Sequence, residues 1–111
     1  MEKRLPIKWD KKAKENLDKI YHYIAEDSES AARHVKRELI KLAQSLNDFP
    51  KKYSKEELLK DEPEECRSVS KWSYKIIFEI TENSLIIIDI FSHNAESLIN
   101  KKVIHLRIIH P

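Results

Sequence analysis

Residues 74–91 read YKIIFEITENSLIIIDIF, and this stretch decides the fold. Every second side chain in residues 74–80 is apolar, which is the pattern of a strand with one buried face. Residues 81–84 are polar and predict a hairpin turn, in which Asn83 is the residue best able to adopt a left-handed conformation. Residues 85–91 are apolar on both faces, as is typical of a central strand. The stretch therefore predicts two antiparallel strands.

Two amphipathic helices are predicted on the N-terminal side of this hairpin. After an N-cap at Asp10, apolar residues recur with helical spacing over residues 13–24. Residues 26–28 end this helix, and Asp27 or Ser28 can cap the next one. A second apolar stripe covers residues 32–46 and stops before Phe49-Pro50, because the residue before a proline avoids the helical conformation. The short connection predicts an antiparallel helical hairpin.

Two further strands complete the predicted sheet. Residues 4–9, RLPIKW, alternate in polarity, and Pro6 places this short strand at an edge. Residues 66–72, CRSVSKW, form another strand. The charged residues 51–64 predict a loop with one helical turn, whereas the tail at 95–111 fits either a strand or a helix.

The order of these elements predicts a single α+β domain spanning residues 1–111. A short N-terminal strand is followed by the helical hairpin and then by a three-stranded antiparallel meander. The helices cover one face of the single sheet, and we expect the other face to remain open. A chain of 111 residues buries about two-thirds of its unfolded surface, so it folds without a covalent staple.

Composition excludes several classes of protein. The chain has one cysteine, Cys66, so an internal disulfide is excluded and a reducing, cytoplasmic setting is favoured. No apolar run approaches the roughly 20 residues of a membrane span, and the N-terminus lacks the apolar core of a signal peptide. The formal net charge of +2 does not indicate nucleic-acid binding. Glycine is absent, which argues against a phosphate-binding loop and a nucleotide cofactor.

Four segments in this order resemble the RelE/ParE superfamily of bacterial toxins from type II toxin–antitoxin systems. They are IKWDKKAKENLDKIYHYIAED, SAARHVKRELIKLAQSLNDFP, CRSVSKWSYKIIFEI and SLIIIDIFSHN, which together cover most of residues 4–94. Arg67, seven residues before the Tyr74-x-Ile76 strand, is similar to the pattern of the ParE-like or plasmid stabilization branch.

The resemblance implies a small cytoplasmic toxin, without a cofactor, that is bound by a cognate antitoxin. ParE-like members inhibit growth by poisoning DNA gyrase and are not enzymes. RelE-like members are endoribonucleases that cut mRNA in the ribosome, and a non-toxic relative that only binds an antitoxin is a third alternative. The RNase branch carries an aromatic residue just after the last strand, where this chain has Asn94-Ala95, and this difference favours the ParE-like function.

Strand parity predicts one polar patch on the open face of the sheet. If Asp89 points away from the helices, His93 shares its face while the strand persists. An imidazole and a guanidinium at this place could act in RNA cleavage, with His93 as acid or base and Arg67 on the phosphate. Strand-end and ion-pairing roles are the alternatives for these two residues. The predicted patch contains Arg67, Lys71, Lys75, Glu79, Asp89 and His93.

The same parity predicts an apolar contact surface on the open face. Leu85, Ile87 and Phe91 would lie there, and Asn94 at the strand end belongs to the same predicted target or antitoxin surface. An antitoxin segment would bury these side chains, and self-association into a homodimer is the alternative.

Other candidate sites are weaker. His22 and Glu26 are one helical turn apart but lack a third ligand, so no metal site is predicted. Trp72 flanks a predicted strand, and packing in the core or against the hairpin is favoured over stacking on a base. The lysine-rich helix face is read as solvated.

Overall fold

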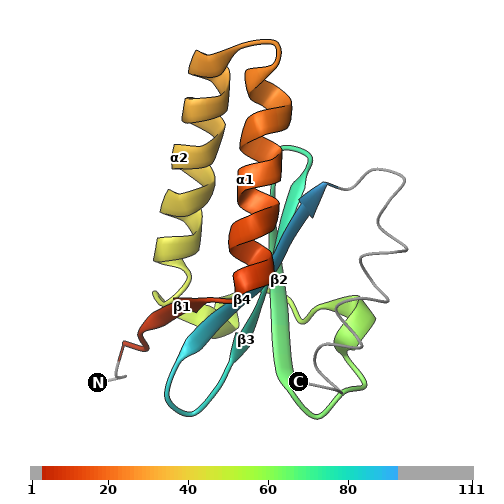
Figure 1. Ribbon diagram of the computed structural model, residues 1–111. Helices are drawn as coiled ribbons and strands as arrows, with labels where there is room; N and C mark the ends of the chain where they lie inside the picture. The colour runs from red at the N-terminus through yellow and green to blue at the C-terminus, as the bar shows by residue number, and fades with distance from the viewer. Residues whose placement is uncertain (1–3, 93–111) are drawn as a thin grey trace.

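The structure is a computed structural model that describes residues 4–92, in which two helices pack on one face of a four-stranded sheet (Figure 1). The predicted α+β fold is therefore confirmed, while the alternatives for the tail at 95–111 lie outside the described residues. The elements are β1 (Ile7–Trp9), α1 (Lys11–Ala25), α2 (Glu29–Ser45), β2 (Glu65–Lys71), β3 (Tyr74–Ile80) and β4 (Leu85–Ser92), with short 3-10 helices η1 (Pro50–Lys52) and η2 (Glu57–Leu59) between α2 and β2.

Side-chain caps begin both helices. The Asp10 carboxylate accepts a hydrogen bond from the backbone N–H of Lys12 at 3.0 Å, and the Ser28 hydroxyl accepts one from Ala31 at 3.1 Å. The expected cap at Asp10 is confirmed, and of the two candidates for the second cap, Asp27 and Ser28, the structure uses Ser28. The chain leaves α2 before Phe49, which has a left-handed backbone (φ 54°).

The sheet has the order β1-β4-β3-β2. The predicted meander is confirmed, because β2 pairs with β3 and β3 with β4, both antiparallel. The short strand β1 lies at the edge, as expected from Pro6, and runs parallel to β4, so the sheet is mixed. The helical hairpin between β1 and the meander allows this parallel arrangement, since a parallel pair needs a long crossover connection.

The turn between β3 and β4 lies at residues 81–84, as predicted, but its mechanism differs. Asn83 is not in a left-handed conformation, so that expectation was wrong. The Thr81 hydroxyl instead accepts hydrogen bonds from the backbone N–H groups of Asn83 (3.3 Å) and Ser84 (3.0 Å). A threonine side chain thus closes the turn without glycine.

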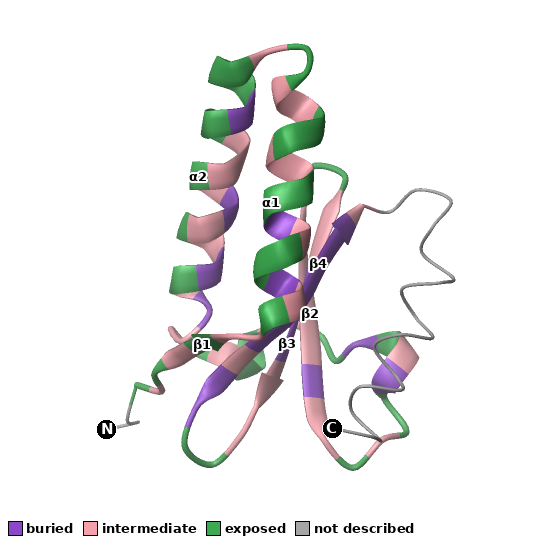
Figure 2. Ribbon diagram, viewed as in Figure 1, coloured by how far each residue is buried: buried purple, intermediate pink, exposed green. Residues whose placement is uncertain are grey.

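The main core lies between the helices and one face of the sheet, where buried residues of both layers meet (Figure 2). A second, smaller buried cluster lies on the opposite face. The main core contains Ala13, Leu17, Leu39, Ala43, Leu46, Ile76, Phe78, Leu85, Ile87 and Ile90, and the second cluster contains Leu59, Cys66, Ile77, Ile88 and Phe91.

A bulge in β4 determines which side chains reach each face. Ile77 pairs with Asp89, whereas its neighbour Phe78 pairs with Ile87, so Ile88 is an extra residue in the ladder. The alternation of faces therefore shifts at this point. Ile87 and Ile90, three residues apart, both face the helices.

Candidate protein-interaction surfaces

The predicted polar patch is divided between the two faces of the sheet. Arg67 lies opposite Phe78 in the ladder and shares its face, which is the face covered by the helices. Glu79 lies opposite Cys66, and Cys66 belongs to the cluster on the other face. The prediction of a single patch was wrong because it placed Arg67 and Lys71 of β2 on the open face, whereas these residues point toward the helices.

Arg67 is held by the chain itself. Its Nε donates to the Glu65 carboxylate at 3.0 Å, and its Nη1 donates to the backbone carbonyls of Tyr53 at 2.6 Å and Lys51 at 3.4 Å. Only 14% of the side chain is exposed. The guanidinium thus clamps the η1 turn to β2, and its donors are largely used within the fold.

Lys71, at the end of β2, also lies on the helix side. Its ammonium is 3.4 Å from a Glu38 carboxylate oxygen on α2 and 5.0 Å from the centre of the Trp72 ring. Lys41 lies 3.7 Å from the other Glu38 oxygen. These neighbouring cations lower the pKa of Glu38, with Lys41 as the larger cause. Glu38 thus joins the end of the β-hairpin to α2.

The predicted contact residues of β4 are placed differently from expectation. Leu85 and Ile87 were expected on the open face, but both are fully buried against the helices, because the bulge lies after them. Asp89 is fully buried, and its Oδ1 accepts hydrogen bonds from Asn16 of α1 and from the backbone N–H of Ile90. Phe91 does face away from the helices, as predicted, but it is buried there.

The two remaining predicted site residues, His93 and Asn94, lie outside the described residues. The RNase alternative required His93 and Arg67 to act together on one phosphate. The described residues supply only Arg67, whose guanidinium is engaged on the helix side. No observation in this part of the chain favours that reaction.

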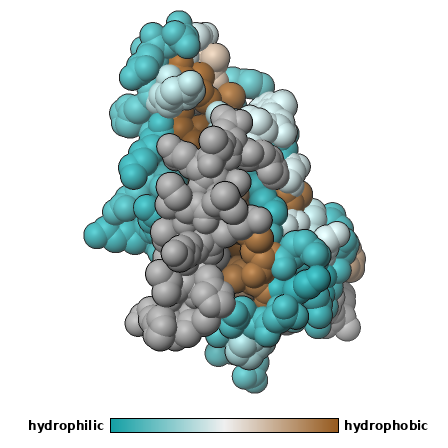
Figure 3. Space-filling view, turned by 90° about the vertical axis from the view of Figure 1, so that its right-hand side faces the viewer, coloured by the Kyte–Doolittle hydropathy of each residue, from teal (hydrophilic) through white to brown (hydrophobic). Residues whose placement is uncertain are grey.

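Residues 54–64, here named the covering segment, first run along the edge of β2 and then reach the face that was expected to be open. The backbone N–H of Glu56 donates to Cys66 at 2.8 Å, and the N–H of Ser68 donates to Ser54 at 3.1 Å. Leu58 and Leu59 then pack in the second buried cluster. Figure 3 views this side of the molecule and shows hydrophobic atoms between hydrophilic ones. The predicted loop therefore extends the edge of the sheet and covers part of its second face.

Carboxylates surround Cys66 in this cluster. Burial, together with Glu79 and the acidic residues of the covering segment, raises the pKa of the Cys66 thiol from 9.0 to about 12. Burial and the charge of Glu64 also raise the pKa of Glu79. The thiol is thus protonated at neutral pH, which makes it an inert buried side chain and not a nucleophile.

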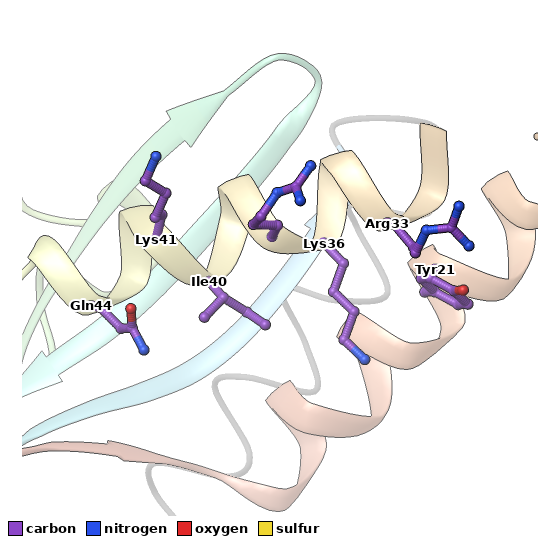
Figure 4. Close-up of a pocket in the computed structure, with 7 residues that line it drawn as sticks. Tyr21, Arg33, Lys36, Ile40, Lys41 and Gln44 are labelled. Carbon is purple, nitrogen blue, oxygen red and sulfur yellow. The ribbon is translucent and has the colours of Figure 1, made fainter. Parts of the chain in front are cut away.

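The face of the helical hairpin turned away from the sheet carries a hollow of about 550 Å³, here named the helix hollow. Lys36 and Ile40 project from α2 toward α1, and Tyr21 comes from α1 (Figure 4). No carboxylate lines this hollow among the described residues. Its lining residues are Tyr21, Arg33, Lys36, Arg37, Ile40, Lys41 and Gln44.

The cations of the helix hollow have only weak partners. Arg33 pairs with Glu29 at 3.3 Å and Lys36 with Asp18 at 3.4 Å, and these pairs are exposed. The sequence analysis treated this helix face as solvated. The signal that could have identified it is the spacing of Arg33, Arg37 and Lys41, which places three cations in one row of α2.

Comparisons with known proteins agree with this fold. Residues 7–97 match the family described as "ParE toxin of type II toxin-antitoxin system, parDE". The chain belongs to the ParE toxin family. No curated protein sequence matches this ParE-family chain significantly. Among solved structures, it is similar to a chain of the chromosomal ParDE toxin–antitoxin system from P. aeruginosa, with a TM-score of 0.64 and 19% identity over 80% of this chain and 96% of that one.

The described part of this ParE-family toxin offers protein surfaces and no metal centre. Residues 4–92 contain no group of three metal-ligating side chains. Within the same residues, no helix is long and apolar enough to cross a membrane.

Proposed function

We propose that this ParE-family chain is the toxin of a type II toxin–antitoxin module, that it inhibits growth in the cytoplasm by binding DNA gyrase, and that a cognate antitoxin neutralises it. Membership of the family supports the role of toxin and the existence of an antitoxin. The resemblance to ParE-like toxins supports gyrase as the target. The proposal that an antitoxin binds this chain is supported by the helix hollow, in which four cations surround an apolar floor.

The helix hollow fits an acidic, amphipathic segment of the antitoxin. Tyr21 and Ile40 offer apolar surface to one or two side chains of such a segment. Arg33, Arg37 and Lys41 stand around this floor, so carboxylates flanking the apolar side chain would meet cations whose partners within the chain are weak. An amphipathic helix that places its apolar face in a groove is a common mode of peptide recognition.

The other face of the toxin is a weaker candidate for the antitoxin. Leu85 and Ile87 are in the main core, and the covering segment packs in the cluster that contains Phe91. An antitoxin would have to displace Leu59 to reach that cluster. Without an antitoxin, self-association through the apolar floor of the helix hollow is the alternative use of that surface.

Charge reversal in the helix hollow tests this assignment. Arg37→Glu with Lys41→Glu should weaken binding to the cognate antitoxin by at least about tenfold and reduce its salt dependence. Lys19→Glu, on an exposed α1 position that does not line the hollow, is the matched control and should bind like the wild type. Equal affinity of all three proteins would place the antitoxin elsewhere.

A further inference from the structure

One end of the molecule exposes aromatic side chains on neighbouring elements. Trp72, at the tip of the β2–β3 hairpin, is 53% exposed, and Tyr23, near the end of α1, is 74% exposed. Tyr74 pairs with Lys71 in the hairpin. Burial raises the pKa of Tyr74, and the phenol of Tyr23 is the second, smaller cause, so Tyr74 lies near the end of α1 as well. We name these three residues the aromatic end. Large exposed aromatics are enriched at the centres of protein interfaces.

The backbone at Trp72 is unfavourable for its side chain. Lys71 pairs with Tyr74, so Trp72 and Ser73 form a two-residue loop, and Trp72 has a φ of 55°. Glycine or asparagine normally occupies such a position, since a bulky side chain is sterically disfavoured there. The turn geometry therefore does not explain a tryptophan at this position. A residue held in a disfavoured conformation often serves a function outside the turn.

The Trp72 ring is also held in place before any partner arrives. The Lys71 ammonium lies 5.0 Å from the ring centre and is itself paired with Glu38 at 3.4 Å. His34 of α2 contacts the ring with centroids 6.0 Å apart. A side chain that is fixed in this way loses little conformational freedom when it binds. The hairpin thus presents a rigid aromatic anchor.

We propose that the aromatic end is the surface with which this toxin contacts its cellular target, and that Trp72 enters an apolar cleft of a target protein. This inference rests on the proposed function, because it names the target-binding surface of the toxin. An apolar cleft fits the half-exposed indole, because Lys71 beside the ring is already paired with Glu38. Nucleic acid fits less well, since Glu26, Asp27 and Glu29 follow Tyr23 at the same end of the helices and would repel phosphates.

The aromatic end and the helix hollow are formed by different residues. Neither Trp72 nor Tyr74 lines the hollow, whereas Tyr21 and Ile40 do. Substitution of Trp72 therefore leaves the proposed antitoxin surface intact. The aromatic end can therefore be tested by Trp72 substitutions alone, whereas Lys41 of the hollow is linked to it through Glu38 and Lys71.

The substitution Trp72→Gly separates binding from stability. Glycine relieves the backbone at φ 55°, which offsets the lost ring contacts with Lys71 and His34 and the greater freedom of the unfolded chain, so the variant should melt close to the wild type. Binding to purified DNA gyrase and growth inhibition on induction should nevertheless fall by at least about tenfold. Trp72→Phe should retain part of both activities, because it keeps an aromatic ring.

Phe49→Gly is the matched control. Phe49 is also an exposed aromatic residue (72%) with a left-handed backbone (φ 54°), but it lies between α2 and η1, away from the aromatic end. This variant should inhibit growth and bind gyrase like the wild type.

The possible results distinguish the target surface, the kind of target and the toxin function from one another. A stable Trp72→Gly variant with full growth inhibition, or an equal loss in Phe49→Gly, overturns the target surface while leaving the toxin function intact. Binding of the wild type to duplex DNA alone, lost in Trp72→Gly, overturns the protein cleft. A wild-type chain that does not inhibit growth overturns the proposed function and the inference that rests on it.

Discussion

The Lys75 ammonium lies 2.8 Å from the carboxylate of Glu56, and Glu56 has no exposed surface. This ion pair connects the covering segment to β3 beside the second buried cluster. Lys75 was expected on an open, polar sheet face, and it does point away from the helices, but its charge is used inside the fold. The pair therefore fixes the segment that closes the face predicted to be open.

Removal of one partner should destabilise the fold. Glu56→Ala leaves Lys75 without its carboxylate and should lower the free energy of unfolding by about 2 kcal/mol, less than for a fully buried pair, because 21% of the Lys75 side chain is exposed. Urea denaturation measures the change. The double substitution Glu56→Leu with Lys75→Met should recover much of the loss, since it replaces the pair by apolar contacts. Unchanged stability of Glu56→Ala would show that the pair does not hold the covering segment.

The buried thiol of Cys66 predicts a loss of stability at alkaline pH. Its pKa is raised from 9.0 to about 12 in the folded chain, so above pH 9 the unfolded chain releases a proton that the folded chain retains. The free energy of unfolding should therefore fall between pH 9 and pH 12. The Cys66→Ala variant should show a shallower decline in urea denaturation over this range. Identical slopes for both proteins would contradict the raised pKa.

Substitution of Glu79 should increase the stability of the fold at neutral pH. Burial and Glu64 raise the pKa of Glu79, so its contribution to stability is present when it is protonated and is lost as pH rises through the folded pKa. Glu79→Gln should be more stable than the wild type at pH 7, by less than about 1 kcal/mol because water screens this half-buried group. Below about pH 4 the two proteins should converge. Glu82→Gln, in the exposed turn, is the control and should change little.

The clamp formed by Arg67 predicts a structural defect. Arg67→Ala removes the bonds to Glu65 and to the carbonyls of Tyr53 and Lys51, which should lower the free energy of unfolding by about 2–3 kcal/mol. Arg67→Lys should recover part of this loss, because an ammonium can still donate to one carbonyl. If Arg67→Ala keeps its stability in urea but no longer inhibits growth, Arg67 contacts the target instead.

Local patterns were sufficient to predict the order of the elements. Asp10 was recognised as a cap and the second cap was narrowed to Asp27 or Ser28 from their positions before apolar stripes, and Pro6 correctly indicated an edge strand. These signals act within a few residues. The parallel pairing of β1 with β4 depends on how the helical hairpin returns the chain, which no local pattern encodes.

The faces of the strands could not be predicted with the same method. Ile88 is one apolar residue in an apolar run, so nothing in residues 85–91 marks it as the extra residue of a bulge, and one extra residue reverses every later position. The assignment of Arg67 to the open face failed for another reason. Its backbone partners, Lys51 and Tyr53, lie in a segment whose sequence predicts a loop.

The central claim is that this ParE-family toxin acts on DNA gyrase. The most direct measurement maps gyrase-linked DNA breaks and mRNA 5′ ends in the same cells after induction of the chain. The account predicts an increase in DNA breaks that carry covalently bound gyrase, without codon-phased cuts in mRNA. Codon-phased mRNA cuts, with gyrase-linked breaks at the level of uninduced cells, would contradict it.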